Sequence, residues 1–158
     1  MSCDFNADDI FLMTEQMERN GAKFYRDSAE GITDPSAKKL LLDLASMEDD
    51  HEKTFASLRA DLTGKEKEPR VFDPEDESVL YLRSLADTRV FFEKDIDTSS
   101  MEESLKEAIV AEKDSIVFYL GMKDLVPEKL GKYRIDAIIK EEMQHITLLS
   151  KELVASKK

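Results

Sequence analysis

The chain contains two histidines, and each follows a glutamate by three positions. Glu48 and His51 form the first Glu-x-x-His pair, and Glu142 and His145 form the second. Residues three positions apart lie on one face of a helix, so the two side chains of a pair can reach the same region. A carboxylate beside an imidazole suits a divalent transition-metal ion. One such pair would mean little in a chain this rich in glutamate, so its context decides.

That context is a set of apolar helical seams, each interrupted near its middle by acidic or imidazole side chains. Read at alternating steps of four and three, the seams are Ala37, Leu41, Leu44, Glu48, His51, Phe55, Leu58 and Leu62; Ile135, Ile138, Glu142, His145 and Leu149; and Leu105, Ala108, Glu112, Ser115, Tyr119 and Met122. Glu18 shares a face with Phe11 and Tyr25. Four carboxylates in one core must bind protons or metal ions, because buried charges are costly unless compensated. Two divalent cations would neutralise the four glutamates, and two imidazoles would complete the ligand set.

The spacing of these residues repeats within the chain. Glu18 precedes Glu48 by 30 positions, and Glu112 precedes Glu142 by 30 positions. The same motif follows both leading glutamates, as Glu18-x-x-Gly21-x-x-Phe24-Tyr25 and Glu112-x-x-Ser115-x-x-Phe118-Tyr119. The repeat predicts two helical hairpins that pack about a pseudo-twofold axis and close one symmetric site.

Each tyrosine of the repeat lies seven residues after a predicted ligand, on the same helical face. Tyr25 follows Glu18, and Tyr119 follows Glu112. We expect their hydroxyl groups to orient metal-bound glutamates across the bundle. The alternative is that both are core tyrosines whose hydroxyls bond to any available polar group.

Helix signals place these residues in an all-α four-helix bundle with one long crossover. The long helices are predicted over 7–30, 35–63, 100–124 and 127–155, with a shorter helical segment over 75–94 in the crossover. Asp34-Pro35 and the Ser100–Glu103 capping box begin two of them, Gly64 ends one, and Pro127 fits a first turn. The chain is interpreted as a single domain, 1–158, whose crossover covers about 64–100. An irregular helical domain is the alternative from pattern alone.

Composition excludes several classes of function. The 158 residues include 35 acidic and 23 basic ones, for a net charge of −12, which disfavours binding to nucleic acid or to an anionic membrane surface. No apolar run approaches the roughly 18 residues that span a bilayer. The single cysteine, Cys3, excludes a disulfide framework and a multi-cysteine metal site, and it favours a cytoplasmic location.

The arrangement Glu18…Glu48-x-x-His51 and Glu112…Glu142-x-x-His145 resembles the ferritin-like di-iron carboxylate proteins, and most of all the rubrerythrins. The resemblance covers nearly the whole chain. It implies two iron ions, with manganese or zinc as alternatives, and it leaves open which glutamates bridge the metals. The phase of Glu141 on its helix points away from the site, so we expect this side chain to be solvated.

Two departures from the rubrerythrin pattern matter. Rubrerythrins typically end in a rubredoxin-like iron site held by four cysteines, and this chain has no such cysteines. We therefore expect electrons to come from a separate donor protein. Rubrerythrins also resemble one another in an extra glutamate three residues after the third-helix glutamate. Here that position is Ser115, which puts the family's peroxidase cycle in question but not the di-iron site.

Three functions fit these expectations. The first is a di-iron oxidoreductase that reduces H₂O₂ or O₂. The second is a ferroxidase or iron-binding protein whose substrate is Fe(II). The third is a helical dimer that uses metal only for stability. A homodimer is expected from the family resemblance and from an apolar stripe in the crossover, which comprises Val79, Leu80, Leu82, Leu85, Val90, Phe91 and Phe92.

Overall fold

The structure, a computed structural model, describes residues 7–62, 82, 84, 100–124, 126 and 128–158. In these ranges the long helices are α1 (Ala7–Glu30), α2 (Pro35–Ala60), α5 (Met101–Lys123) and α6 (Lys132–Ser156). A single 3₁₀ turn, η1 (Glu128–Leu130), precedes α6. The predicted all-α bundle is confirmed. The crossover predicted at about 64–100 lies almost wholly outside the described residues, as does Cys3.

Side-chain caps begin two of the helices where the sequence predicts them. The Asp34 carboxylate accepts a hydrogen bond of 2.8 Å from the backbone N–H of Ala37, and Pro35 occupies the first helical position of α2. The Ser100 hydroxyl accepts a hydrogen bond of 3.3 Å from the backbone N–H of Glu103 at the start of α5. Each cap satisfies a backbone donor that the first helical turn leaves without a partner.

Two helix limits differ from the prediction. α2 ends at Ala60 and not at residue 63, because the N–H of Leu62 bonds to the carbonyl of Arg59 and tightens the last turn. α6 begins at Lys132 and not at residue 127, because Gly131 has a φ of 92°, in the left-handed region that interrupts a helix. Pro127 itself lies outside the described residues.

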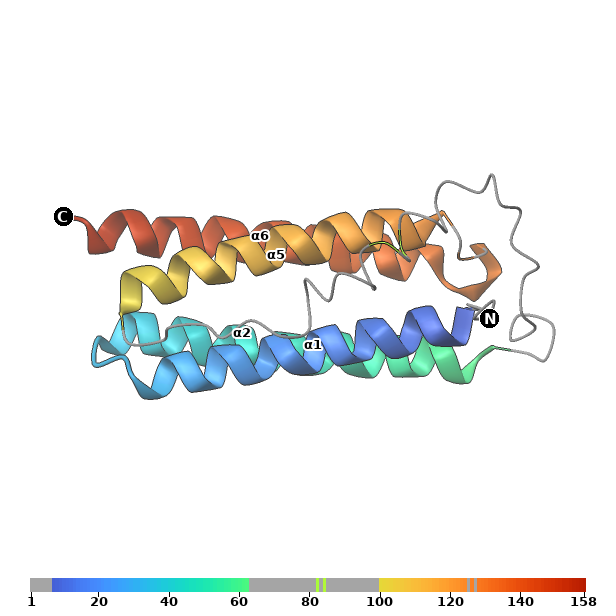
Figure 1. Ribbon diagram of the computed structural model, residues 1–158, viewed down its shortest axis with the longest axis horizontal. Helices are drawn as coiled ribbons and strands as arrows, with labels where there is room; N and C mark the ends of the chain where they lie inside the picture. Colours follow the sequence, from blue (N-terminus) through green and yellow to red (C-terminus); the bar gives the residue numbers. More distant parts are fainter. Residues whose placement is uncertain (1–6, 63–81, 83, 85–99, 125, 127) are drawn as a thin grey trace.

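The helices form two antiparallel hairpins that lie on one another. In Figure 1, α1 and α2 lie side by side in the lower half, and α5 and α6 lie side by side in the upper half. The chain runs through α1 and α5 in opposite directions, and these two helices also contact each other (Figure 1). Residues from both hairpins therefore meet along the axis of the bundle.

Two apolar clusters fill the bundle on either side of its middle. One cluster includes Phe11, Phe55, Phe118 and Met122, and the other includes Leu41, Leu44, Leu105 and Leu149. Leu82, one of two described residues between 63 and 99, is fully buried in the first cluster. The predicted crossover thus contributes this one described apolar side chain to the core.

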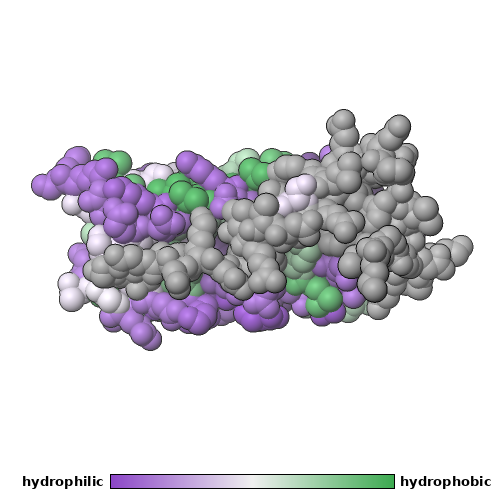
Figure 2. Space-filling model, viewed as in Figure 1, coloured by the Kyte–Doolittle hydropathy of each residue, from purple (hydrophilic) through white to green (hydrophobic). Residues whose placement is uncertain are grey.

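The surface is mainly hydrophilic where described residues are visible in Figure 2, with small separate apolar patches. Within the described ranges, none of the helices combines the length and apolar character needed to cross a membrane.

Candidate metal centre

A layer of polar side chains lies between the two apolar clusters. Its six members are Glu18, Glu48, His51, Glu112, Glu142 and His145, and none is more than 4% exposed. α1 and α5 each contribute one glutamate, whereas α2 and α6 each contribute a Glu-x-x-His pair. The structure thus brings together all six residues that the sequence nominates as ligands.

The six residues divide into two overlapping groups of possible ligands. One group is Glu18, Glu48, His51 and Glu142, and the other is Glu48, Glu112, Glu142 and His145. In each group, one ligand atom from every residue lies within 4.8 Å of the others. Glu48 and Glu142 belong to both groups, so these two glutamates would be within reach of both ions if two were bound. The sequence leaves this choice open.

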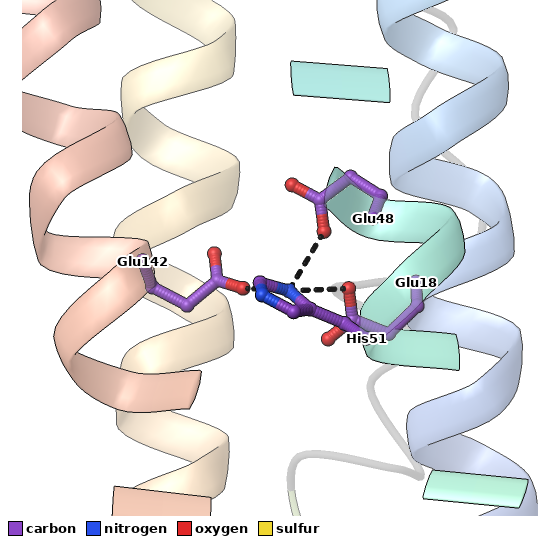
Figure 3. Close-up of side chains that lie close together, drawn as sticks. All are labelled: Glu18, Glu48, His51 and Glu142. Atoms are coloured by element: carbon purple, nitrogen blue, oxygen red, sulfur yellow. Dashed lines mark ion pairs between the residues drawn. The ribbon is translucent and has the colours of Figure 1, made fainter. Parts of the chain in front are cut away.

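The imidazole of His51 projects from α2 toward glutamates of both hairpins (Figure 3). Its Nδ1 lies 2.9 Å from Oε1 of Glu142 and 3.5 Å from Oε2 of both Glu18 and Glu48. In the second group, Nδ1 of His145 lies 3.2 Å from Oε1 of Glu112. The two imidazole rings stack, with their centroids 5.6 Å apart. Each histidine therefore turns the same ring nitrogen toward the carboxylates.

Two tyrosines join the hairpins through the unshared glutamates. Tyr25 on α1 donates its hydroxyl hydrogen to Oε1 of Glu112 on α5. Tyr119 on α5 donates to Oε1 of Glu18 on α1. Both bonds are buried and both cross the bundle, as the pseudo-twofold arrangement predicts.

Comparison with known proteins identifies the family of this chain. The model of the Rubrerythrin family matches residues 9–153, which is most of the chain. The chain belongs to the rubrerythrin family. Its fold is also similar to a crystal structure described as a ferritin-like diiron-carboxylate protein from Thermotoga maritima, with a TM-score of 0.71 and 24% sequence identity. That similarity covers 96% of this chain and 97% of the other. No curated protein matches the sequence significantly.

Burial changes the acidity of the carboxyl groups in this rubrerythrin-family site. Burial and the nearby charge of Glu48 raise the pKa of Glu18 well above its usual value. Burial and the charge of Glu112 raise the pKa of Glu142 to about 8. Glu112 differs, because hydrogen bonds with Glu142 and His145 outweigh burial and lower its pKa. Without metal, Glu142 therefore holds a proton at neutral pH.

The histidines show the opposite balance of forces. Burial disfavours the charged form of His145, but the carboxylates of Glu112, Glu142 and Glu48 outweigh burial and raise its pKa to about 12. Burial likewise opposes the charged form of His51, yet the neighbouring carboxylates raise its pKa above the usual range. Protons thus compensate the buried carboxylates wherever metal cations do not.

The donor atoms fit a pair of divalent metal ions. Nδ1 of His51 and Oε1 of Glu142 are buried and close together, yet neither makes a properly angled hydrogen bond to the described part of the chain. Once deprotonated, both atoms can therefore offer a lone pair to a cation. Four carboxylates and two imidazoles form the donor set of the di-iron and di-manganese carboxylate bundles, and zinc also accepts such ligands.

One contact at this site was not predicted from the helical phase of α6: that of Glu141 with His51. The side chain of Glu141 is 46% exposed, as expected, but its Oε2 also lies 2.6 Å from Nε2 of His51. A helical phase describes one helix alone, whereas this contact joins α6 to α2 of the other hairpin. The sequence does contain one sign of this contact, because Glu141 stands directly before the Glu142-x-x-His145 pair. Carboxylates often accept a hydrogen bond from the nitrogen of a histidine that faces away from its metal.

Proposed function

We propose that the protein is a di-iron oxidoreductase that reduces H₂O₂ or O₂ with electrons from a separate donor protein. The observation that carries this proposal is the pair of overlapping ligand groups that share Glu48 and Glu142. Shared carboxylates favour two ions held close together over two independent sites. Two bound irons can supply two electrons to one oxygen–oxygen bond.

The reaction balances with two electrons and two protons. Reduction of H₂O₂ breaks its O–O bond and yields two water molecules. Reduction of O₂ by two electrons and two protons yields H₂O₂. In this proposal a separate donor protein returns the electrons. With peroxide as substrate, the protein would act in defence against oxidative stress.

In this proposal the residues of the chain hold the metal ions and orient the ligands. The six buried ligands supply four carboxylates and two imidazoles, and Tyr25 and Tyr119 fix the orientation of Glu112 and Glu18. The apolar clusters on either side limit the access of water to this layer. Low local polarity strengthens each ligand's electrostatic attraction for a cation.

The test loads the metal-free protein with Fe(II) under anaerobic conditions and follows its absorption after H₂O₂ or O₂ is added. Binding of about two irons per chain and faster oxidation by H₂O₂ than by O₂ would support the proposal. We expect Glu48→Ala and His145→Ala to lose iron and the reaction, whereas Asp43→Ala on the exposed face of α2 should react normally.

Other outcomes would favour the alternatives. Faster turnover with O₂ and continued uptake of Fe(II) would identify a ferroxidase. A bound metal pair that reacts with neither oxidant, and whose removal unfolds the protein, would indicate a structural role. The mass of the protein in solution would test the homodimer, which we also propose.

A further inference from the structure

The two halves of the metal centre correspond residue by residue through a shift of 94 positions. This shift relates Glu18 to Glu112, Tyr25 to Tyr119, Glu48 to Glu142 and His51 to His145. The unshared glutamate, the tyrosine bond, the shared glutamate and the histidine thus occur twice. The same shift relates Met47 on α2 to Glu141 on α6, and here the chemistry differs.

The outer nitrogen of each histidine reflects this difference. Nε2 of His51 lies 2.6 Å from Oε2 of Glu141. Nε2 of His145 is buried and has no hydrogen-bond partner in the described part of the chain, and the side chain is 0% exposed. At the position corresponding to Glu141, α2 has Met47, whose thioether is only a weak acceptor.

A carboxylate at Nε2, the outer nitrogen, changes how well Nδ1, the inner nitrogen that faces the carboxylate layer, can bind a metal. It holds the imidazole proton on Nε2, leaves the Nδ1 lone pair free for a metal and makes that lone pair more basic. A buried N–H without an acceptor instead adds a desolvation cost to the metal-binding tautomer. The two histidines therefore differ as ligands although their inner nitrogens face similar sets of carboxylates.

We infer that the two metal positions are unequal, and that the position beside His51 binds its ion more tightly and fills first. The position beside His145 fills second and loses its ion first. Glu141 acts as a positioning residue for His51, and Met47 leaves His145 without the equivalent support. This inference rests on the metal centre of the proposed function but not on its redox chemistry.

The test uses the fact that the full chain has only two histidines. Protein labelled with ¹⁵N-histidine is freed of metal and titrated with Zn²⁺, which is diamagnetic and has no redox reaction. The Nδ1 resonances of the two imidazoles are followed by NMR and assigned with His51→Gln and His145→Gln. We expect the first equivalent of Zn²⁺ to shift the His51 signal and the second to shift the His145 signal.

Exchanging the supporting residues should change this order. Glu141→Gln should weaken the His51 position by roughly 10–100-fold, so that the first equivalent no longer prefers it. Met47→Glu should strengthen the His145 position and bring the two titrations together. The controls are Glu152→Gln on α6 and Leu42→Glu on the exposed face of α2, and both should keep the order of the natural chain.

Two results would overturn the inference. They are simultaneous shifts of both histidines in the natural chain, and an unchanged order of filling in Glu141→Gln. Failure of Zn²⁺ to shift either resonance would contradict the metal centre itself, and with it the proposed function. Ordered filling without any reaction of the iron-loaded protein would support the inference while opposing the oxidoreductase.

Discussion

Tyr119 on α5 donates its hydroxyl hydrogen to the carboxylate of Glu18 on α1, so the two hairpins meet at a buried candidate ligand. Tyr119→Phe keeps the ring and removes this bond. We expect metal affinity to fall by roughly 10–100-fold, because the partner that orients the carboxylate is lost. Competition with a chromophoric chelator measures the affinity. Tyr133→Phe, at a side chain that is 74% exposed, should have no effect, and equal affinities for both variants would contradict the role of Tyr119.

Metal binding should release protons. Glu142 and His145 have pKa values raised to about 8 and about 12, so both hold protons at neutral pH in the metal-free protein. A cation must displace these protons, so affinity for Zn²⁺ should rise as pH increases from about 6 to about 8. Calorimetry in buffers of different ionisation enthalpy counts the released protons, and we expect more than one per ion. Binding that is independent of pH would contradict this protonation pattern.

Glu142 should make the stability of the metal-free protein depend on pH. Its pKa is about 8 in the folded state and close to the ordinary glutamate value of 4.5 in the unfolded state, so the folded state binds more protons in that interval. The stability contributed by the proton is fully present below about 4.5 and is lost as pH rises to about 8. Glu142→Gln cannot lose it.

Relative to the natural chain, metal-free Glu142→Gln should therefore gain stability progressively across this interval, by an amount on the order of a few kcal/mol, and stay constant above it. Urea unfolding at several pH values measures the difference. Glu152→Gln on α6 is the control and should run parallel to the natural chain. A difference that shrinks as pH rises would show that the sign is wrong.

Two glycines should respond oppositely to alanine. A Cβ at Gly131 would lie 2.8 Å from Cδ2 of Leu58, on a backbone with a φ of 92°, so Gly131→Ala should destabilise the protein by at least about 1 kcal/mol. A Cβ at Gly21 would make an ordinary 3.5 Å contact with Glu48, so Gly21→Ala in the middle of α1 should stabilise by about 0.5–1 kcal/mol. Thermal unfolding without metal compares them, and similar shifts would refute the argument.

Local patterns predicted most of the fold because they act within a few residues. The Asp34 and Ser100 caps and the apolar seams depend on neighbours in the same helix, and the structure has them where the sequence places them. The predicted start of α6, at residue 127, is wrong by five residues, because the helix begins at Lys132. The observed start depends on the positive φ of Gly131, packed beside Leu58 of another helix, and this distant neighbour is not visible in the sequence near Pro127.

At the candidate site, too, the sequence predicted the features that depend on spacing but not those that depend on how the hairpins pack. Matching spacings indicated that six residues would meet, and the structure places them together. Which glutamates are shared, and that Glu141 reaches His51, depend on how one hairpin lies on the other. Spacing along one chain contains no such information. The role of the six as metal ligands stays a prediction for the titrations above to test.

The division of ligands between the hairpins has a consequence for folding. Each hairpin contains one histidine and two of the four glutamates, and each ligand group combines residues from both hairpins. Neither half of a growing chain can complete a coordination shell, and Glu18 has emerged from the ribosome long before Glu142 is synthesised. Closing such a large loop is slow and entropically costly. An ion bound by either group would therefore have to wait until both hairpins are made, and it would join the beginning of the polypeptide to its end.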